Sequence, residues 1–225
     1  MPHTLLIPLV GPMQAWGSRS RFDDRDTHPE PTKSGVLGLV CAALGRARSE
    51  PLTDLNALRF GVRADAPGRA ATDFHTARDV LRASGSGTTT VTSERHYLAD
   101  ARFLCGLEGD DLSLLHALEA ALKNPVWPLS LGRRSFPLTL PPYLPGGSVR
   151  PDTSLEGALK HEPWRRLSRW ERPPESELRL VLERADGEVV QSDVPEDFAA
   201  RRFGLRRLRV TAAPRPAEEE PHVSV

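Results

Sequence analysis

The start of one expected helix carries groups that could bind an anion. Thr32, Lys33, Ser34 and Gly35 stand in a row after a proline, and a largely apolar run continues from them to Gly45. Thr32 suits an N-cap and Gly45 a C-terminal cap, so the spacing predicts a helix between them. The free N–H groups of a first helical turn carry partial positive charge, and the Lys33 ammonium stands beside them. The segment therefore predicts a site for a phosphate group.

A loop that wraps a nucleoside triphosphate is not predicted at this helix. Such a loop needs glycines ahead of the lysine, and residues 27–32 contain none. An NTPase is therefore disfavoured, whereas a single phosphodiester of a nucleic acid remains compatible with the helix start. The helix itself is apolar nearly all round, which indicates that it is buried and holds the site rigidly.

A second segment, residues 11–17, combines glycines with amphipathic side chains. Gln14 offers both a donor and an acceptor, Trp16 offers a stacking surface, and Gly17 allows a close backbone approach. These properties suit contact with a nucleobase. A strand end with a buried tryptophan explains the same residues, and composition alone favours that structural interpretation.

Basic side chains gather in two further places. A polar loop over residues 11–30 carries Arg19, Arg21 and Arg25, and a later segment carries the pair Arg133 and Arg134. Arginine suits bidentate phosphate contacts and stacking on bases, although a GC-rich genome also raises arginine content. An arginine pair in a loop usually faces solvent, so the second pair gains weight only if it meets the first loop in space.

Two histidines are the candidates for catalysis. Asp73 precedes His75 by two residues, Glu94 precedes His96 likewise, and Tyr97 is adjacent. A histidine beside a carboxylate could act as a general base in RNA cleavage. The spacing matches no metal motif, and polar residues are ordinary where a hairpin begins. The sequence thus favours a chain without catalytic residues, metal or cofactor.

Size and composition bound the remaining possibilities. The chain has 225 residues, with 30 lysines and arginines balanced by 30 aspartates and glutamates. Its length allows one large domain or two small ones, and its net charge identifies no partner. Cys41 and Cys105 lie in apolar runs, which predicts buried free thiols and fits a reducing cytoplasm. The apolar run at residues 5–10 is too short for a membrane span, so we expect a cytoplasmic protein without a membrane partner.

The order of elements predicts an α+β fold. Strands are expected at residues 4–10, 59–66 and 96–107, helices at 32–45 and 110–123, and a loop or short strand at 131–138. Between the second and third strands, residues 68–93 lose apolar pattern and suggest a projecting hairpin with a Gly/Ser/Thr-rich tip at 83–90. The order is that of a ferredoxin-like, RRM-type domain over residues 1–140.

A Pro/Gly-rich stretch from residue 141 to 151 suggests a domain boundary. Residues 141–211 then predict a small β-rich domain, with a short helix at 154–160, a hairpin of strands 177–184 and 188–193, and a strand at 205–210. The turn of that hairpin is assigned to Asp186 and Gly187. Residues 212–225 are expected to be disordered.

Several segments together resemble a known family. Gly-Pro-Met-Gln-Ala-Trp-Gly (11–17) is followed by Pro-Thr-Lys-Ser-Gly-Val-Leu-Gly-Leu (31–39), Arg-His-Tyr-Leu-Ala-Asp-Ala (95–101) and Leu-Gly-Arg-Arg-Ser-Phe-Pro-Leu (131–138). In this order they resemble the CasD family, the subtype I-E branch of the fifth Cas family, whose members are subunits of the type I-E CRISPR Cascade complex. The resemblance covers residues 4–145 well and is weak beyond them.

The resemblance implies a fold and a function. Family members have an RRM-like domain with a protruding thumb hairpin and a small C-terminal β domain. They hold the 5′ handle of the CRISPR RNA and contact the backbone subunit of Cascade. They also contact the large subunit, which reads the flanking motif of the target DNA. In this subtype they do not process the precursor RNA, whereas a relative in another subtype does.

Carried onto this chain, the family's plan gives a set of expected RNA contacts. Residues 11–17 and 31–38 would form the handle-binding cleft, residues 75–97 the thumb, and Arg133 and Arg134 would lie near the RNA backbone. The tip is less charged here than is usual in the family. The expected RNA-binding residues are Gln14, Trp16, Gly17, Arg19, Arg21, Arg25, Thr32, Lys33, Ser34, Gly35, His75, Arg95, Tyr97, Arg133 and Arg134. The alternatives are a metal-independent endoribonuclease that uses His75 or His96 on repeat RNA, and a pure protein scaffold.

Overall fold

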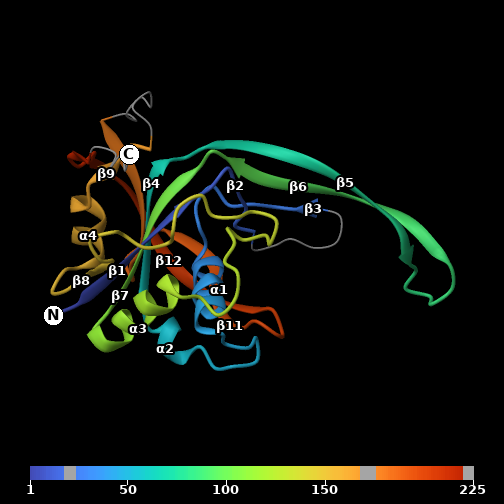
Figure 1. Ribbon diagram of the computed structural model, residues 1–225, viewed down its shortest axis with the longest axis horizontal. Helices are drawn as coiled ribbons and strands as arrows, with labels where there is room; N and C mark the ends of the chain where they lie inside the picture. Colours follow the sequence, from blue (N-terminus) through green and yellow to red (C-terminus); the bar gives the residue numbers. More distant parts are fainter. Residues whose placement is uncertain (18–23, 168–175, 220–225) are drawn as a thin grey trace.

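A seven-stranded antiparallel sheet forms the centre of the molecule, in the order β11-β12-β10-β4-β7-β1-β8 (Figure 1). The computed structural model describes residues 1–17, 24–167 and 176–219. The strands of this sheet are β1 (His3–Val10), β4 (Arg59–Ala66), β7 (Arg102–Gly109), β8 (Val149–Arg150), β10 (Glu177–Glu183), β11 (Val189–Asp197) and β12 (Arg202–Pro214).

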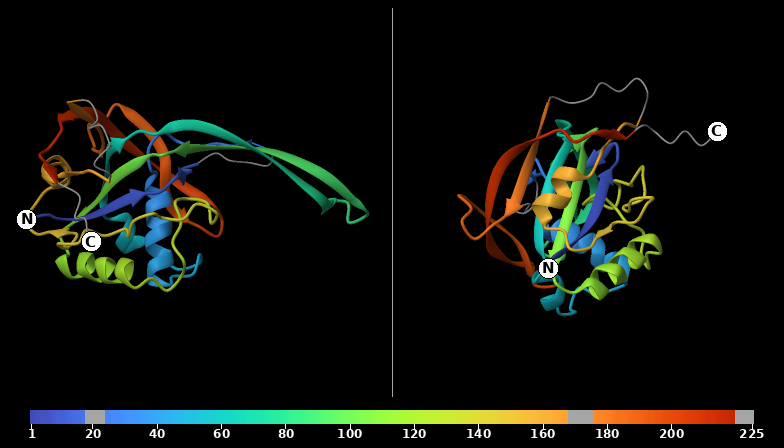
Figure 2. Two further views of the ribbon diagram at one scale, coloured as in Figure 1. Left: turned by 45° about the horizontal axis from the view of Figure 1, so that its top comes forward. Right: turned by 90° about the vertical axis from the view of Figure 1, so that its left-hand side faces the viewer.

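Helices cover both faces of the central strands (Figure 2). On β1, Leu5, Ile7 and Leu9 belong to the larger core, whereas Leu6 belongs to a second core on the other face. The larger core is closed by α1 (Lys33–Leu44), α2 (Thr53–Asn56) and α3 (Leu112–Lys123), and the second by α4 (Leu155–His161).

Local signals set the ends of α1 where the sequence predicts them. The Thr32 hydroxyl accepts a hydrogen bond from the Gly35 N–H at 3.2 Å, and Gly45 adopts a left-handed φ of 75° at the C-terminus. The expected helix is therefore confirmed, with both of its caps. Most of its side chains are buried, including Val36, Leu37 and Val40.

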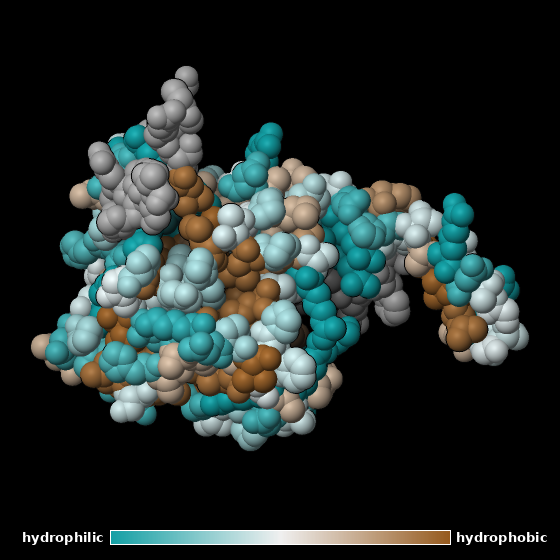
Figure 3. All heavy atoms as spheres, in the orientation of Figure 1, coloured by the Kyte–Doolittle hydropathy of each residue, from teal (hydrophilic) through white to brown (hydrophobic). Residues whose placement is uncertain are grey.

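A long hairpin projects from the sheet (Figure 1). It consists of β5 (Arg69–Leu81) and β6 (Thr88–Ala99), and its root is held by β2 (Met13–Gln14) and β3 (Asp24–Arg25), which both pair with β6. The hairpin is largely exposed, and apolar side chains, among them Val80 and Leu81, lie at its far end (Figure 3).

The hairpin continues strands β4 and β7 beyond a sharp bend. Gly68 lies on one side of the bend at a φ of 72°, and a Cβ there would be 2.6 Å from the Ala99 carbonyl oxygen. Asp100 lies on the other side at a φ of 57°, and its N–H donates to the Pro12 carbonyl at 3.1 Å. The single strand expected at 96–107 is therefore wrong, because Asp100 divides it into β6 and β7.

The sheet does not end at the boundary expected near residue 141. Strand β10 pairs with β4, so residues 177–214 extend the same sheet that contains β1 and β7. The expected hairpin of 177–184 with 188–193 is wrong. Both strands exist, but β12 lies between them and pairs with each. A local turn at Gly187 is present without the pairing that it suggested, because β12 pairs with β10 on one side and with β11 on the other.

The tail is ordered further than expected. Strand β12 runs to Pro214, and β13 (Glu218–Glu219) pairs in parallel with β9 (Trp164–Arg165). Residues 212–219 are thus part of the fold, and residues 220–225 lie outside the described chain. No helix in the described ranges is both long and apolar enough to cross a membrane. Both cysteines are buried, and burial raises the pKa of Cys41 to about 11.

Candidate nucleic-acid interface

Gln14 and Trp16 are built into the core. Gln14 is fully buried, and its Nε2 donates to the carbonyls of Leu9 at 3.1 Å and Ala101 at 2.7 Å. Its Oε1 accepts from Trp16 Nε1 at 3.1 Å, and the indole is only 1% exposed. The expectation that Trp16 stacks on a base and Gln14 reads its edge is corrected accordingly. The amide instead joins β2 to β1 and to the start of β7.

Three of the four segments that carry the family resemblance, residues 11–17, 31–39 and 131–138, pack against one another. A Cβ at Gly35 would lie 2.8 Å from Trp16 Cε3, so the first turn of α1 rests on the indole ring. The Ala15 N–H donates to the Leu131 carbonyl at 3.1 Å. Gly132 has a φ of 87°, and a Cβ there would be 1.8 Å from the Ala15 oxygen. These glycines are explained by close backbone approach within the chain.

The amino end of α1 is occupied by a carboxylate of the chain itself. The Lys33 N–H donates to Asp193 Oδ2 at 2.8 Å, and Asp193 is fully buried. Arg206 binds the same carboxylate through Nε at 2.5 Å and Nη2 at 2.7 Å, and Gln191 Nε2 donates to it at 2.9 Å. The place predicted for a phosphate is thus filled by Asp193, which lies 160 residues away in the sequence.

The Lys33 side chain points inward as well. It is 1% exposed, and its Nζ donates to the Asn56 carbonyl at 3.1 Å and to Glu183 Oε2 at 3.1 Å. Burial lowers the pKa of Lys33, and the charge of Glu183 offsets part of this effect. Thr32 and Ser34 are buried too. The prediction of a phosphate cradle at this helix is therefore corrected. Its groups instead join α1 to β10 and β11.

A basic cluster does form at the root of the hairpin. Arg133 Nη2 donates to the carbonyls of Arg25 at 3.1 Å and His96 at 2.8 Å, and its guanidinium lies 5.4 Å from the centre of the Phe136 ring. Burial, and then the positive charges of Arg95 and Arg25, lower the pKa of Arg133. We call Arg25, Arg95 and Arg133 the root arginines. Arg133 of the later arginine pair thus meets Arg25 of the first basic loop in space, which sequence alone left open.

Acidic groups moderate this cluster. Asp73 lies opposite Arg95 in the ladder, and Asp73 and Asp26 act against the lowering of the Arg133 pKa. Arg133 is half-buried and holds β3 against β6, and Arg95 is half-buried and donates to Ser93 Oγ at 3.2 Å, whereas Arg25 is exposed. Arg25 is therefore the root arginine with the most freedom to meet a ligand.

The remaining expected contacts are placed as follows. Gly17, His75 and Arg134 are exposed, Tyr97 is half-buried with its ring 5.9 Å from that of Phe136, and Arg19 and Arg21 lie outside the described residues. The sequence does not predict that the Phe136 ring contacts both Arg133 and Tyr97. Its position two residues after an arginine pair is the only sequence signal for it.

The two candidate catalytic histidines point to opposite faces of the hairpin. His96 lies across from Thr72, whereas His75 lies across from Ser93. Side chains of cross-strand partners lie on the same face of the hairpin, so His96 shares a face with Thr72. Side chains along one strand alternate between the two faces, and His75 lies three residues after Thr72. His75 therefore lies on the other face from His96. His75 contacts Asp73, and His96 Nε2 lies 3.3 Å from Asp24. The two histidines therefore do not form one acid–base pair. Among the described residues, no group of three or more His, Cys, Asp or Glu side chains could hold a metal ion.

Comparisons with known proteins agree on one family. The family model described as CRISPR-associated protein (Cas_Cas5) matches residues 4–209. The CRISPR system Cascade subunit CasD of Escherichia coli (strain K12) is 35% identical over 180 residues, which cover 72% of this chain and 79% of that protein.

Two solved structures are similar over nearly the whole chain. One, described as the crystal structure of a Cas protein, has a TM-score of 0.78 and 44% identity, and the match covers 97% of this chain and 100% of that one. The other belongs to a CRISPR RNA-guided surveillance complex, with a TM-score of 0.77 and 32% identity over 95% of this chain and 91% of that one.

Proposed function

Because the chain belongs to the Cas5 family of CRISPR-associated proteins, we propose that it holds the 5′ handle of the CRISPR RNA as a subunit of a type I-E Cascade complex. The observation that carries this proposal is the cluster of root arginines at the base of the hairpin. Arginines grouped beside an exposed strand pair suit the phosphates of a single strand that crosses the hairpin root.

The proposal includes a finer reading of the fold. Strands and helices β1, α1, β4, β7, α3 and β8 constitute a ferredoxin-like, RRM-type unit, and the β5–β6 hairpin is its thumb. The spatial order β4-β7-β1-β8, antiparallel throughout, supports this reading. The C-terminal strands then widen the RRM-type sheet.

The partners follow from the same proposal. The chain contacts the backbone subunit and the large subunit of Cascade, and it meets target DNA only through them. The resemblance to CasD and to a chain of a surveillance complex supports this assignment. Phosphate contact is assigned to Arg25, Arg95 and Arg134, with Arg133 as the residue that positions them.

Replacing both Arg25 and Arg95 by alanine is expected to weaken the salt dependence of handle binding. Each phosphate contact to a single strand adds about 0.7 to the slope of log K against log salt, so the double variant should flatten the slope by about 1.4. The measurement is binding of a labelled handle RNA to the full chain over a series of salt concentrations.

The matched control replaces Arg48 and Arg201 by alanine. Both residues are exposed, and their replacement removes the same amount of charge. It should leave the slope within error of the parent chain. An equal loss in both double variants would mean that total charge, and not the hairpin root, attracts the RNA. An unchanged slope in the first variant would remove Arg25 and Arg95 from the RNA surface and favour the scaffold hypothesis.

We propose that the chain is not a nuclease. Its similarity to CasD, a Cascade subunit, supports this, and His75 and His96 lie on opposite faces of the hairpin, so they do not form one acid–base pair. Purified chain incubated with labelled repeat RNA in the absence of metal is expected to leave it intact. Cleavage that disappears in His75→Ala or His96→Ala, and persists in the exposed-histidine control His116→Ala, would establish the endoribonuclease alternative instead.

A further inference from the structure

One face of the β5–β6 hairpin carries an exposed aromatic side chain beside two carboxylates. Phe74 of β5 is 63% exposed and lies across from Glu94 of β6, which in turn lies across from Asp24 of β3 (Figure 1). Cross-strand partners share a face, so these three side chains stand in one line on the same surface. We call Asp24, Glu94 and Phe74 the Phe74 row.

The arginines at the root of the hairpin belong to the opposite face. Arg25 and Arg95 directly follow Asp24 and Glu94, and neighbouring side chains along a strand point to opposite faces. In agreement with this, Arg95 Nε donates to Ser93 Oγ at 3.2 Å. The Phe74 row is therefore separate from the proposed phosphate contacts, and its charge is negative.

The charge of the row is only partly balanced within the chain. His96 Nε2 lies 3.3 Å from Asp24 Oδ1, and His96 Nδ1 lies 2.8 Å from Thr72 Oγ1. A neutral imidazole satisfies both contacts when Nε2–H donates to Asp24 and the Thr72 hydroxyl donates to Nδ1. In the described ranges Glu94 has no side-chain partner. Because like charges that face each other across a ladder repel, a bound cation would stabilise the row.

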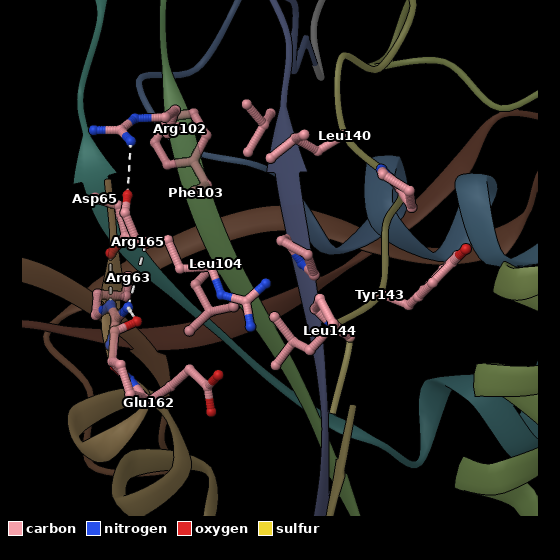
Figure 4. Close-up of a pocket in the computed structure, with 15 residues that line it drawn as sticks. Arg63, Asp65, Arg102, Phe103, Leu104, Leu140, Tyr143, Leu144, Glu162 and Arg165 are labelled. Carbon is pink, nitrogen blue, oxygen red and sulfur yellow. Dashed lines mark hydrogen bonds and ion pairs between the residues drawn. The ribbon is translucent and has the colours of Figure 1, made fainter. Parts of the chain in front are cut away.

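The charged side chains around the cavity on the α4 face of the sheet are engaged differently. This cavity has a volume of about 150 Å³ and is lined by Arg63, Asp65, Arg102 and Arg165, among other residues. Arg63 Nε donates to Asp65 Oδ1 at 2.6 Å, and Arg102 Nη1 donates to the Arg165 carbonyl at 3.1 Å (Figure 4). These groups already bind within the chain, whereas the carboxylate of Glu94 is available to a ligand.

An exposed phenyl ring beside an unpaired carboxylate suits an arginine side chain. A guanidinium is attracted to the face of an aromatic ring, and its N–H groups can bind a carboxylate at the same time. A nucleotide suits the row less well, because Glu94 and Asp24 would repel its phosphate. An uncharged apolar partner would leave the two carboxylates without a counterion.

We propose that the Phe74 row binds an arginine side chain from a basic segment of a protein partner. The guanidinium stacks on the Phe74 ring and pairs with Glu94, and Asp24 adds a weaker attraction. The hairpin then meets a basic protein segment on the face opposite its root arginines. The inference does not depend on RNA binding, because none of the root arginines takes part in it.

A fluorine label on the ring tests this inference in the full chain. Phe74 is replaced by 4-fluoro-phenylalanine, and its ¹⁹F resonance is followed in separate titrations with Ac-Leu-Arg-Leu-NH2 and Ac-Leu-citrulline-Leu-NH2. Citrulline keeps the shape of arginine without its charge, so the arginine peptide should bind about tenfold more tightly. Equal affinity of the two peptides would overturn the proposal. Adenosine monophosphate that binds as tightly as the arginine peptide would also overturn it, in favour of base stacking.

Two controls locate the binding. Glu94→Gln removes the unpaired carboxylate and should narrow the tenfold difference to about threefold, whereas Glu188→Gln, at an exposed position outside the hairpin, should leave it unchanged. A second label, Leu81→4-fluoro-Phe, reports on a 76% exposed position across from Thr88, without a carboxylate opposite. It should respond equally to both peptides. A preference that survives in Glu94→Gln, or that also appears at position 81, contradicts the assignment.

Discussion

Replacing Asp193 by alanine is expected to lower the free energy of unfolding by about 3–5 kcal/mol, the usual cost of breaking a buried ion pair by removing one partner. The change leaves Arg206 buried without its bidentate carboxylate, and it removes the acceptor for the Lys33 N–H at the start of α1. Urea denaturation of the full chain measures this loss.

Two further variants separate this network from a general effect of losing an aspartate. Asp197→Ala removes a carboxylate that is 31% exposed, pairs with Arg202 at 3.5 Å and accepts from the Ala200 N–H at 2.8 Å, and it should cost about 1 kcal/mol. The double change Asp193→Leu with Arg206→Met replaces the buried pair by apolar groups and should recover much of the stability. If Asp193→Ala costs no more than Asp197→Ala, the buried pair does not stabilise the fold.

Trp16→Ala is expected to destabilise the chain by about 3–5 kcal/mol, as do other truncations of buried large aromatic residues. The indole is 1% exposed, it supports Gly35 in the first turn of α1, and its Nε1 is the donor for Gln14. Trp16→Phe should cost about 1–3 kcal/mol, because it keeps much of the ring contact but leaves the Gln14 Oε1 without that donor.

The chain offers a matched control in Trp127, whose side chain is 59% exposed. Trp127→Ala should change stability by no more than about 0.5 kcal/mol. The same variants test the alternative role of Trp16. If Trp16 stacks on a base, Trp16→Phe loses handle affinity under conditions where the variant is fully folded. Packing as its sole role predicts that the folded variant binds like the parent chain.

The parts of the fold that the sequence predicts well are those set by local chemistry. The hydroxyl of Thr32, the left-handed glycine at position 45 and the Asp111 N-cap of α3 fix their helix ends with bonds that span few residues. Such signals do not depend on what packs from elsewhere.

The largest failures have one physical cause, which is contact between segments that are distant in the sequence. The turn at Asp186 and Gly187 is real, yet β12 displaces β11 from the side of β10. The first turn of α1 predicts a phosphate site, but its Lys33 N–H binds Asp193 and the Lys33 ammonium binds Glu183. No residue near Lys33 in the sequence predicts that a carboxylate from β11 will bind there. In contrast, the family resemblance does identify segments that lie near the hairpin root. In the structure, the glycines of these segments, Gln14 and Trp16 pack within the chain and support the region that carries the root arginines.

The pairing of β10 with β4 has a consequence during translation. Strand β4 is synthesised more than a hundred residues before β10, and β10 must in turn pair with β12, which ends at Pro214. The nascent polypeptide therefore leaves the ribosome with one edge of its sheet bare until the last strands emerge. Such an edge can pair with other chains. The yield of folded protein should therefore depend more on holdase chaperones, and on the rate of translation ahead of β10, than it does for a protein whose sheet is completed early.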